Sequence, residues 1–186
     1  MNVRLHKLFI ASGLAAGVAA FPLAPVALAA GDHAGGHGHA TGIGQPGEAS
    51  EAARTVEITM HDNYYEPESV SVGEGETVRF VVRNEGDLVH EFNIGTEAMH
   101  AAHQEEMEMM VAHGVIVGDH IDHDMMKMDM GNGHTMEHDD PNSVLLEPGQ
   151  SAEIVWTFTT DADLEFACNV PGHYEAGMTG EIEIEH

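Results

Sequence analysis

Hydrophobic and polar residues alternate along two portions of the chain, residues 54–95 and 141–186. In the first portion, TVEITM, ESVSVGEGETVRFVVRNEG and LVHEFNIG alternate around short polar or Gly-containing turns. In the second portion, SVLLEPGQSAEIVWTFTT, DLEFAC and TGEIEIEH follow the same pattern. A period of two predicts strands with one buried face, and short strands at regular spacing predict an antiparallel sandwich or barrel. The two portions together hold about 90 residues, which is enough for one hydrophobic core and not for two.

Residues 96–140, between the two portions, show almost no strand pattern. The beginning of this insertion, TEAMHAAHQEEMEMMVAHG, predicts a helix with Thr96 as its N-cap and Gly114 as its stop. One face of that helix would hold three methionines and two histidines at spacings of three and four residues: Met99, His103, Met107, Met110 and His113. The remainder, residues 118–140, predicts a loop. We therefore expect residues 98–138 to form a surface insertion whose removal leaves the sandwich folded.

The first 29 residues, MNVRLHKLFIASGLAAGVAAFPLAPVALA, predict a secretory signal peptide. A short basic region with Arg4 and Lys7 precedes an apolar run that ends in small residues. The alternative is a retained membrane anchor. Pro22 and Pro25 argue against an anchor, because they leave the longest uninterrupted apolar segment short for a bilayer. We predict export, followed by cleavage and no membrane insertion of the mature protein.

Residues 30–53 are rich in Gly, Ala and His and show no apolar periodicity, which predicts a flexible leader. His33, His37 and His39 could bind a metal weakly, or they could be incidental residues of a spacer. One folded domain is then expected at residues 54–186, and it contains the insertion.

The chain is strongly acidic, with 32 Asp and Glu against six Lys and Arg and a formal charge of −26. Cleavage after residue 29 would leave four basic residues against 32 acidic ones, a formal charge of −28. Such a surface argues against nucleic acid and anionic lipid as partners and favours cations, although a salt-adapted organism would give this charge to any exported protein. The single cysteine excludes an internal disulfide, so the thiol is unpaired, bridged to another chain or bound to a ligand.

One short segment, CNVPGHYEAGM, combines three soft or borderline metal ligands. Cys168, His173 and Met178 follow one another with four residues between each pair. Two histidines and a cysteine in one plane, with a distant axial methionine, form the blue-copper electron-transfer site. His90, at the start of the strand LVHEFNIG, offers the second histidine, and the Pro-Gly pair would shape the loop. The main alternative is a structural zinc site, which Met178 argues against because methionine is a poor zinc ligand.

These residues and their spacing resemble the cupredoxin family, small Greek-key β-sandwiches that hold a type 1 copper. The resemblance covers residues 54–95 and 141–186. It implies an all-β, cupredoxin-like Greek-key β-sandwich, here with a Met/His-rich and partly helical insertion at 96–140. It also implies three equatorial copper ligands and one axial ligand, namely His90, Cys168, His173 and, in the axial position, Met178. The signal peptide, the acidic surface and the Met/His-rich tracts are most similar to the periplasmic cupredoxins of bacterial copper tolerance, the CopI-type proteins, which implies a periplasmic location.

Two features depart from the family pattern. Many cupredoxins place Asn directly after the first histidine, where it ties that strand to the cysteine loop, and this chain has Glu91 at that position. The tether must therefore be replaced or absent. The long insertion is also foreign to minimal electron carriers, which weakens the interpretation of the chain as an ordinary redox shuttle.

The insertion holds seven histidines and nine of the twelve methionines. Methionines on the predicted helix could simply pack on the sandwich. In MMKMDMGNGHTMEH, Lys127 and Asp129 alternate with methionines, which indicates a hydrated segment. Thioethers select Cu(I) and imidazoles accept either copper state, so we predict additional copper binding here. The candidates are His120, His123, Met125, Met126, Met128, Met130, His134, Met136 and His138. The alternative is that exposed methionines scavenge oxidants.

Together these features predict a periplasmic type 1 copper-binding protein that acts in copper tolerance by binding copper, and by oxidising or sequestering it. The alternatives are a small electron carrier for a respiratory or oxidase partner and a copper chaperone that delivers metal to another protein. An enzyme is not expected, because a type 1 site has no open position for a substrate and the only His-x-His set, at residues 37–39, lies in the leader. The expected partners are copper ions and a redox or copper-delivery protein.

Overall fold

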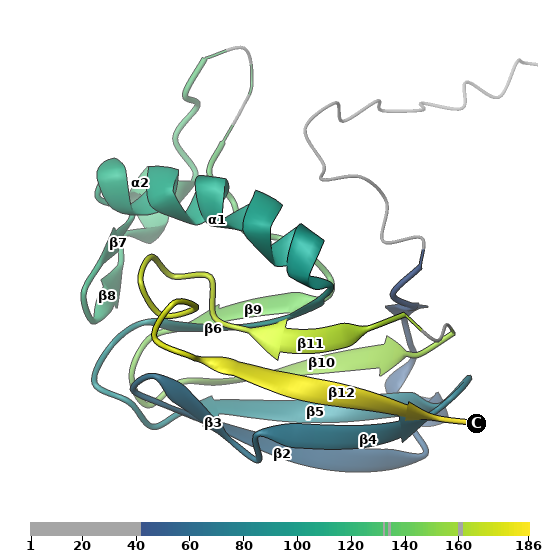
Figure 1. Ribbon diagram of the computed structural model, residues 1–186. Coiled ribbons are helices and arrows are strands. Elements are labelled where there is room, and N and C mark those ends of the chain that lie inside the picture. Colours follow the sequence, from purple (N-terminus) through teal and green to yellow (C-terminus); the bar gives the residue numbers. More distant parts are fainter. Residues whose placement is uncertain (1–41, 132, 134, 160–161) are drawn as a thin grey trace, which may run out of the picture. The chain divides into compact units, whose positions relative to one another are not determined.

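The computed structural model describes residues 42–131, 133, 135–159 and 162–186, in which the strands form two five-stranded sheets and a small hairpin (Figure 1). The first sheet has the order β1 (Gln45–Pro46), β10 (Ser151–Thr157), β5 (Thr77–Asn84), β2 (Arg54–His61) and β3 (Tyr64–Glu66). The second has the order β4 (Ser69–Gly73), β12 (Thr179–Glu185), β11 (Leu164–Ala167), β6 (His90–Gly95) and β9 (Ser143–Leu146). The predicted signal peptide at 1–29 lies outside the described residues.

The remaining elements are short, apart from one helix. They are the 3-10 helix η1 (Ala49–Glu51), the helix α1 (Glu97–Ala112), the hairpin strands β7 (Ile116–Val117) and β8 (His120–Ile121), and the helix α2 (His123–Met126). Within the described ranges, no helix is both long and apolar enough to cross a bilayer.

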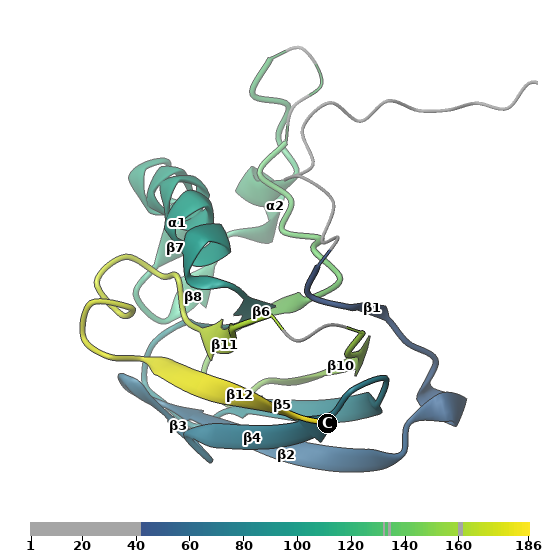
Figure 2. The ribbon, with the colours of Figure 1, turned by 45° about the vertical axis from the view of Figure 1, so that its right-hand side comes forward.

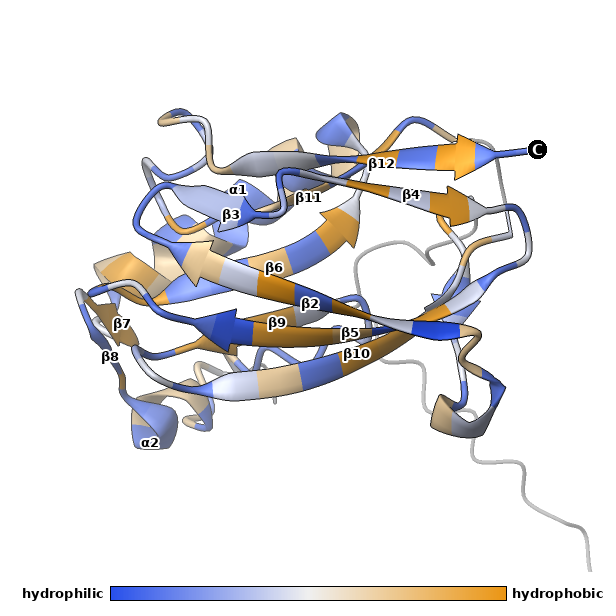
Figure 3. Cartoon of the chain, turned by 90° about the horizontal axis from the view of Figure 1, so that it is seen from below, coloured by the Kyte–Doolittle hydropathy of each residue, from blue (hydrophilic) through white to orange (hydrophobic). Residues whose placement is uncertain are grey.

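The hydrophobic core lies between the two sheets, because alternate residues of each strand face inward. Figure 3 shows this alternation as bands of hydrophobic and hydrophilic residues along strands such as β10 and β12. Phe92 lies 5.2 Å from Phe166 and 5.5 Å from Phe80 between ring centroids, so the rings join the two sheets. All three rings are fully buried. Burying each such side chain stabilises the fold by about 1.5–3 kcal/mol.

The connections between the sheets produce two parallel strand pairs, β2 with β5 and β12 with β4. The chain leaves the first sheet after β3, forms β4 in the second sheet and returns for β5. For that reason β2 and β5 lie side by side without a hairpin. The predicted all-β Greek-key sandwich is confirmed, whereas the expectation that every pair is antiparallel was wrong for these two.

Residues 42–53, predicted to be part of the flexible leader, instead complete one edge of the first sheet. β1 pairs with β10, and Trp156 Nε1 donates a hydrogen bond of 2.9 Å to the carbonyl oxygen of the buried Ile43. Gly44 has a φ of +110°, and a Cβ there would collide with the Thr157 carbonyl oxygen. The predicted leader therefore ends too late in the sequence. A two-residue strand next to Gly and Pro gives no alternation from which it could be predicted.

The predicted helix is confirmed as α1, which lies against β6 and β11 (Figures 1 and 2). Thr96 caps it as expected, since its Oγ1 accepts a hydrogen bond of 3.3 Å from the Met99 N–H. Gly114 follows the helix with a φ of +77°. The buried face differs in part from the predicted one, because His113 is exposed and His100 is buried. The buried residues of α1 are His100, His103, Met107 and Met110.

The second part of the insertion, predicted as a loop, contains β8 and α2. Asp122 caps α2, because its Oδ1 accepts a hydrogen bond of 3.0 Å from the Met125 N–H. Val115, Ile116 and Ile121 are buried members of the main core. The insertion is therefore part of the folded domain and not a separate surface segment, and removal of residues 98–138 would take these side chains out of the core.

Candidate metal centre

Three of the predicted copper ligands come together at one end of the second sheet. His90 is the first residue of β6, and Cys168 directly follows β11, which pairs with β6. The Cys168 Sγ lies 3.3 Å from His173 Nδ1 and 3.9 Å from His90 Nδ1, and the two nitrogens are 3.2 Å apart. Ligand bonds of about 2 Å in a trigonal plane place donor atoms roughly 3.5 Å apart. The three side chains therefore surround a space that fits one metal ion.

The loop after β11 owes its shape to backbone hydrogen bonds and two glycines. The Cys168 N–H donates to the Met178 carbonyl at 3.1 Å, and the Met178 N–H donates to the His173 carbonyl at 3.0 Å. Gly172 and Gly177 have φ values of +88° and +93°, which other residues adopt only at a cost. Met178 is fully buried, and its backbone is fixed next to both other loop ligands. The loop thus explains the glycines of the CNVPGHYEAGM segment.

Burial keeps the ligand side chains of the metal-free site without charge. Burial raises the pKa of the Cys168 thiol to about 12, although the Glu91 N–H donates a hydrogen bond of 3.3 Å to its sulfur. Burial also lowers the pKa of His90 and of His173, which favours neutral imidazoles with a free lone pair. A metal that enters must displace the thiol proton, and it then meets three ligands that are otherwise without charge.

Asp62 orients His90, a role that no sequence pattern indicates. The His90 Nε2 lies 2.9 Å from the Asp62 Oδ1. This hydrogen bond lowers the pKa of Asp62 and leaves the His90 Nδ1 directed at Cys168 and His173. Carboxylates commonly fix metal-binding histidines in this way. Gly86 permits the contact, since a Cβ at this position would lie 2.8 Å from His90 Nε2.

Comparison with known proteins identifies the family of the chain. A family model described as a cupredoxin-like domain matches residues 38–113. The chain is 48% identical to the copper-resistant cuproprotein CopI of Pseudomonas aeruginosa over 153 aligned residues. The aligned residues make up 79% of this chain and 84% of the relative. The chain belongs to the CopI family. It is also 41% identical to CopI of Rubrivivax gelatinosus over 155 residues, 82% of this chain and 80% of the relative.

Solved structures agree on the fold of this CopI family member. Auracyanin B superposes with a TM-score of 0.55 at 20% identity, over 77% of this chain and 96% of that protein. Reduced auracyanin from Roseiflexus castenholzii superposes with a TM-score of 0.51 at 23% identity, over 73% of this chain and 99% of that protein. These likenesses support the cupredoxin fold, which was predicted from the sequence.

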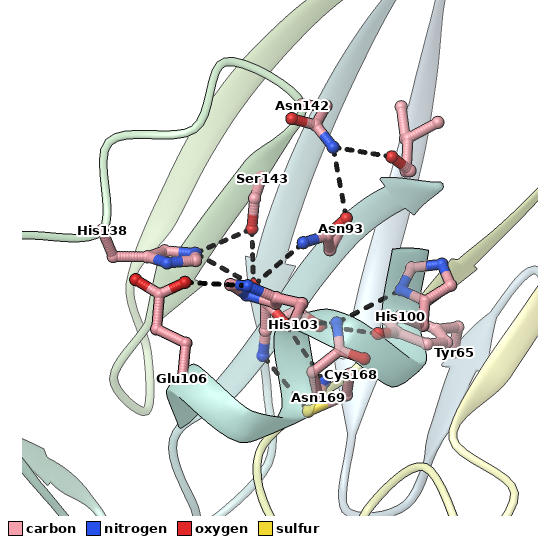
Figure 4. A network of polar contacts seen from close by, with 12 residues as sticks. Tyr65, Asn93, His100, His103, Glu106, His138, Asn142, Ser143, Cys168 and Asn169 are labelled. Carbon is pink, nitrogen blue, oxygen red and sulfur yellow. Dashed lines mark hydrogen bonds and ion pairs between the residues drawn. The ribbon is translucent and has the colours of Figure 1, made fainter. Parts of the chain in front are cut away.

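In this CopI family member the tether between β6 and the cysteine loop is made by Glu91 itself. Glu91 is fully buried, and its Oε2 accepts hydrogen bonds from the Asn169 N–H at 3.1 Å and from the Asn169 side-chain amide at 2.8 Å. Tyr65 supports the same strand by donating a hydrogen bond of 2.6 Å to the Glu91 carbonyl. Figure 4 shows Tyr65, Cys168 and Asn169 as members of the same network of polar contacts. The departure from the family pattern thus replaces the tether and does not remove it.

The candidates for additional copper binding are not all in similar surroundings. His120, His123, Met128 and Met130 are exposed, Met125 and Met126 are half-buried, and Met136 is buried in the core, whereas His138 packs against Glu91. His134 lies outside the described residues. His120 Nδ1 contacts the Glu147 carboxylate at 2.8 Å. Among the described His, Cys, Asp and Glu residues, only His138 of this set belongs to a group of three close ligand atoms. Copper binding at exposed side chains would therefore involve Met128 and Met130 together with the exposed histidines His120 and His123. It stays a prediction.

Proposed function

We propose that this chain is an exported copper-resistance protein that holds one copper ion in a type 1 site. The proposed equatorial ligands are His90, Cys168 and His173, and the proposed axial ligand is Met178. The observation that carries the proposal is the convergence of one buried thiol and two imidazole nitrogens within 3.9 Å of one another. A thiolate, two imidazoles and a thioether match copper better than zinc, which prefers more thiolates or histidines.

Copper would supply one-electron chemistry at this site, and the protein's residues would hold it in a fixed geometry. Asp62 would orient His90, Glu91 would fix the strand end at Cys168, and the loop hydrogen bonds would hold His173 next to Met178. His90, Cys168 and Met178 are buried, whereas His173 is only half-buried. His173 is thus the ligand through which electrons would pass to or from a partner or an incoming Cu(I) ion. This arrangement leaves no open position for a substrate, which favours binding and electron transfer over catalysis.

A role in copper resistance is favoured over a plain electron carrier for two reasons. The relatives from P. aeruginosa and R. gelatinosus are named as copper-resistant cuproproteins. In addition, Met128 and Met130 are 55% and 47% exposed, so their thioethers are accessible to Cu(I). A carrier would have no evident use for them.

Titration of the purified mature protein with Cu(II) and Cu(I), in separate experiments, tests this function. We expect an intense visible band that saturates at one Cu(II) per chain, and a larger total capacity for Cu(I). A host that lacks its own copy should regain copper tolerance when it produces the protein. A single copper in both titrations, with no gain in tolerance, would favour the carrier instead.

Replacing Met178 with leucine should change the redox potential and preserve the colour. A weak axial donor that stabilises Cu(II) is lost, whereas the three equatorial ligands remain, so the reduction potential should rise. Leucine also fills a similar buried volume, which limits the effect on stability to roughly 1.5 kcal/mol or less. Redox titration followed by visible absorption measures the shift. Met109→Leu, at an exposed position of α1, is the matched control, and a shift of equal size there would show that Met178 is not the axial ligand.

A further inference from the structure

A second cluster of potential metal ligands lies on the other side of Glu91. The Glu91 Oε1 contacts His103 Nε2 at 2.9 Å and His138 Nε2 at 2.9 Å. His103 comes from α1, and His138 comes from the segment before β9. The side chains of Glu91, His103 and His138 are 0%, 8% and 2% exposed. Figure 4 shows the two histidines converging from different segments, with Ser143 beside them.

The tether to Asn169 does not account for this cluster. That tether uses only the Oε2 of Glu91. The two histidines, the Ser143 hydroxyl at 2.7 Å and the Asn93 side-chain amide at 3.3 Å all contact the Oε1. The Ser143 hydroxyl and the Asn93 amide both donate to this oxygen, so it would be hydrogen-bonded without the imidazoles. Four polar groups on one oxygen, two of them imidazoles, point to a further role.

The second ring nitrogen of His103 supports a ligand role. Its Nδ1 lies 3.2 Å from the Glu106 carboxylate, which corresponds to the carboxylate–histidine pairing found at metal sites.

The spacing of the three donor atoms suits a metal. Tetrahedral coordination with bonds of about 2.0–2.1 Å places ligand atoms roughly 3.3 Å apart. The three donor atoms lie within 4.8 Å of one another, so small side-chain movements would bring them to that spacing. The Ser143 hydroxyl lies 2.9 Å from His138 Nε2 and 2.7 Å from the Glu91 Oε1, so it is close enough to act as a fourth ligand.

We propose that Glu91, His103 and His138 form a second, buried metal site whose occupant is Cu²⁺. Two imidazole nitrogens and a carboxylate oxygen form a donor set for a divalent ion, and among first-row divalent metals Cu²⁺ binds such ligands most tightly. The set contains no thiolate or thioether, so it differs from the type 1 site and from the exposed methionines. His90 and Glu91 are consecutive residues of β6, and the Glu91 N–H contacts the Cys168 sulfur at 3.3 Å. The two sites would therefore share one strand.

Copper retention by single-site variants tests this proposal, which goes beyond the type 1 function. The full mature protein is loaded with excess Cu²⁺ and dialysed against free histidine, which removes ions held by exposed side chains. The unaltered chain should retain two coppers, while His103→Gln and His138→Gln should each retain one and keep the type 1 band. His113→Gln, an exposed histidine at the end of α1, is the matched control and should retain two. EPR of the second copper should show coupling to two nitrogens, and both variants should lose that signal.

Several results would overturn the proposal. They are retention of one copper by the unaltered chain, or retention of two coppers by both variants. The type 1 band is read in every sample, so its absence would count against the proposed function and not against this site. If the variants do not fold, anomalous X-ray scattering from copper-loaded crystals of the unaltered chain decides the matter. Copper density bonded to both histidines is expected, and its absence would refute the site.

Discussion

Replacing Cys168 with serine is expected to abolish the intense visible absorption of the copper-loaded protein. The band would arise from charge transfer between a cysteine thiolate and Cu(II), and serine offers no thiolate. Cys168 is the only cysteine of the chain, so no other thiol can take its place. The change removes little volume from a fully buried position, so the fold should persist. Visible spectroscopy of the protein with one equivalent of Cu(II), before and after the change, measures the effect.

A matched control separates the thiolate from general damage. His123→Gln alters an exposed histidine of α2 and should leave the band unchanged. Urea unfolding of both variants in the metal-free state checks that each is folded. A band that survives in folded Cys168→Ser would show that the colour has another source. In a tolerance assay this variant should fail while still binding Cu(I) at its exposed methionines.

Replacing Glu91 with alanine should have the largest effect on stability. The change removes a fully buried carboxylate that contacts Asn169, His103 and His138. Breaking a buried pair by deleting one partner typically costs about 3–5 kcal/mol, because the other charge is left buried and uncompensated. Urea unfolding of the metal-free protein should therefore show a loss of this size. Glu91→Gln, which keeps the shape and an acceptor for Asn169, should lose less.

The loss of unfolding free energy caused by Glu91→Ala should depend on pH. The pKa of Glu91 is depressed in the folded protein, so its stabilisation is fully present above about 4.3 and declines as the pH falls further. The pKa of His103 is raised to about 10, so its contribution is full below about 6.5 and declines as the pH rises toward 10. The difference between the two proteins should thus be largest near pH 5–6. A deficit that stays constant from pH 4 to pH 9 would contradict this ion-pair account.

Much of the sandwich could be predicted from the sequence, because its strands alternate with a period of two. The segments that became β5, β6 and β12 each show that pattern over six or more residues. The short strands β1, β3, β7 and β8 could not be predicted, since two or three residues contain too few alternations. The two parallel pairs depend on crossings between the sheets, which no local pattern records.

The candidate type 1 site was predicted almost completely, because its loop ligands are close in sequence. Their ligand role remains a prediction, although the structure brings His90, Cys168 and His173 together. Asp62 was missed because it meets His90 only through the fold. The partners of Glu91 were missed for the same reason. His103 and His138 lie 12 and 47 residues further along the chain, inside a segment that was interpreted as a removable surface insertion.

That interpretation failed because methionine and histidine are ambiguous in a hydropathy pattern. Met107 and Met110 are fully buried, whereas Met128 and Met130 are exposed, although all four belong to the same Met/His-rich tract. Sequence alone does not distinguish a methionine that fills a core from one that faces solvent.

The short strand β1 has a consequence for how the molecule behaves in a crowded solution. β1 occupies the outer edge of the first sheet and satisfies backbone groups of β10 that would otherwise face outward. An unprotected edge of this kind pairs readily with a strand of another molecule. A chain shortened to begin at residue 54 would expose the edge of β10 and uncover Trp156, whose indole N–H would lose its bond to Ile43. Twelve residues that contribute no metal ligand to the proposed type 1 site would thereby protect the protein from self-association.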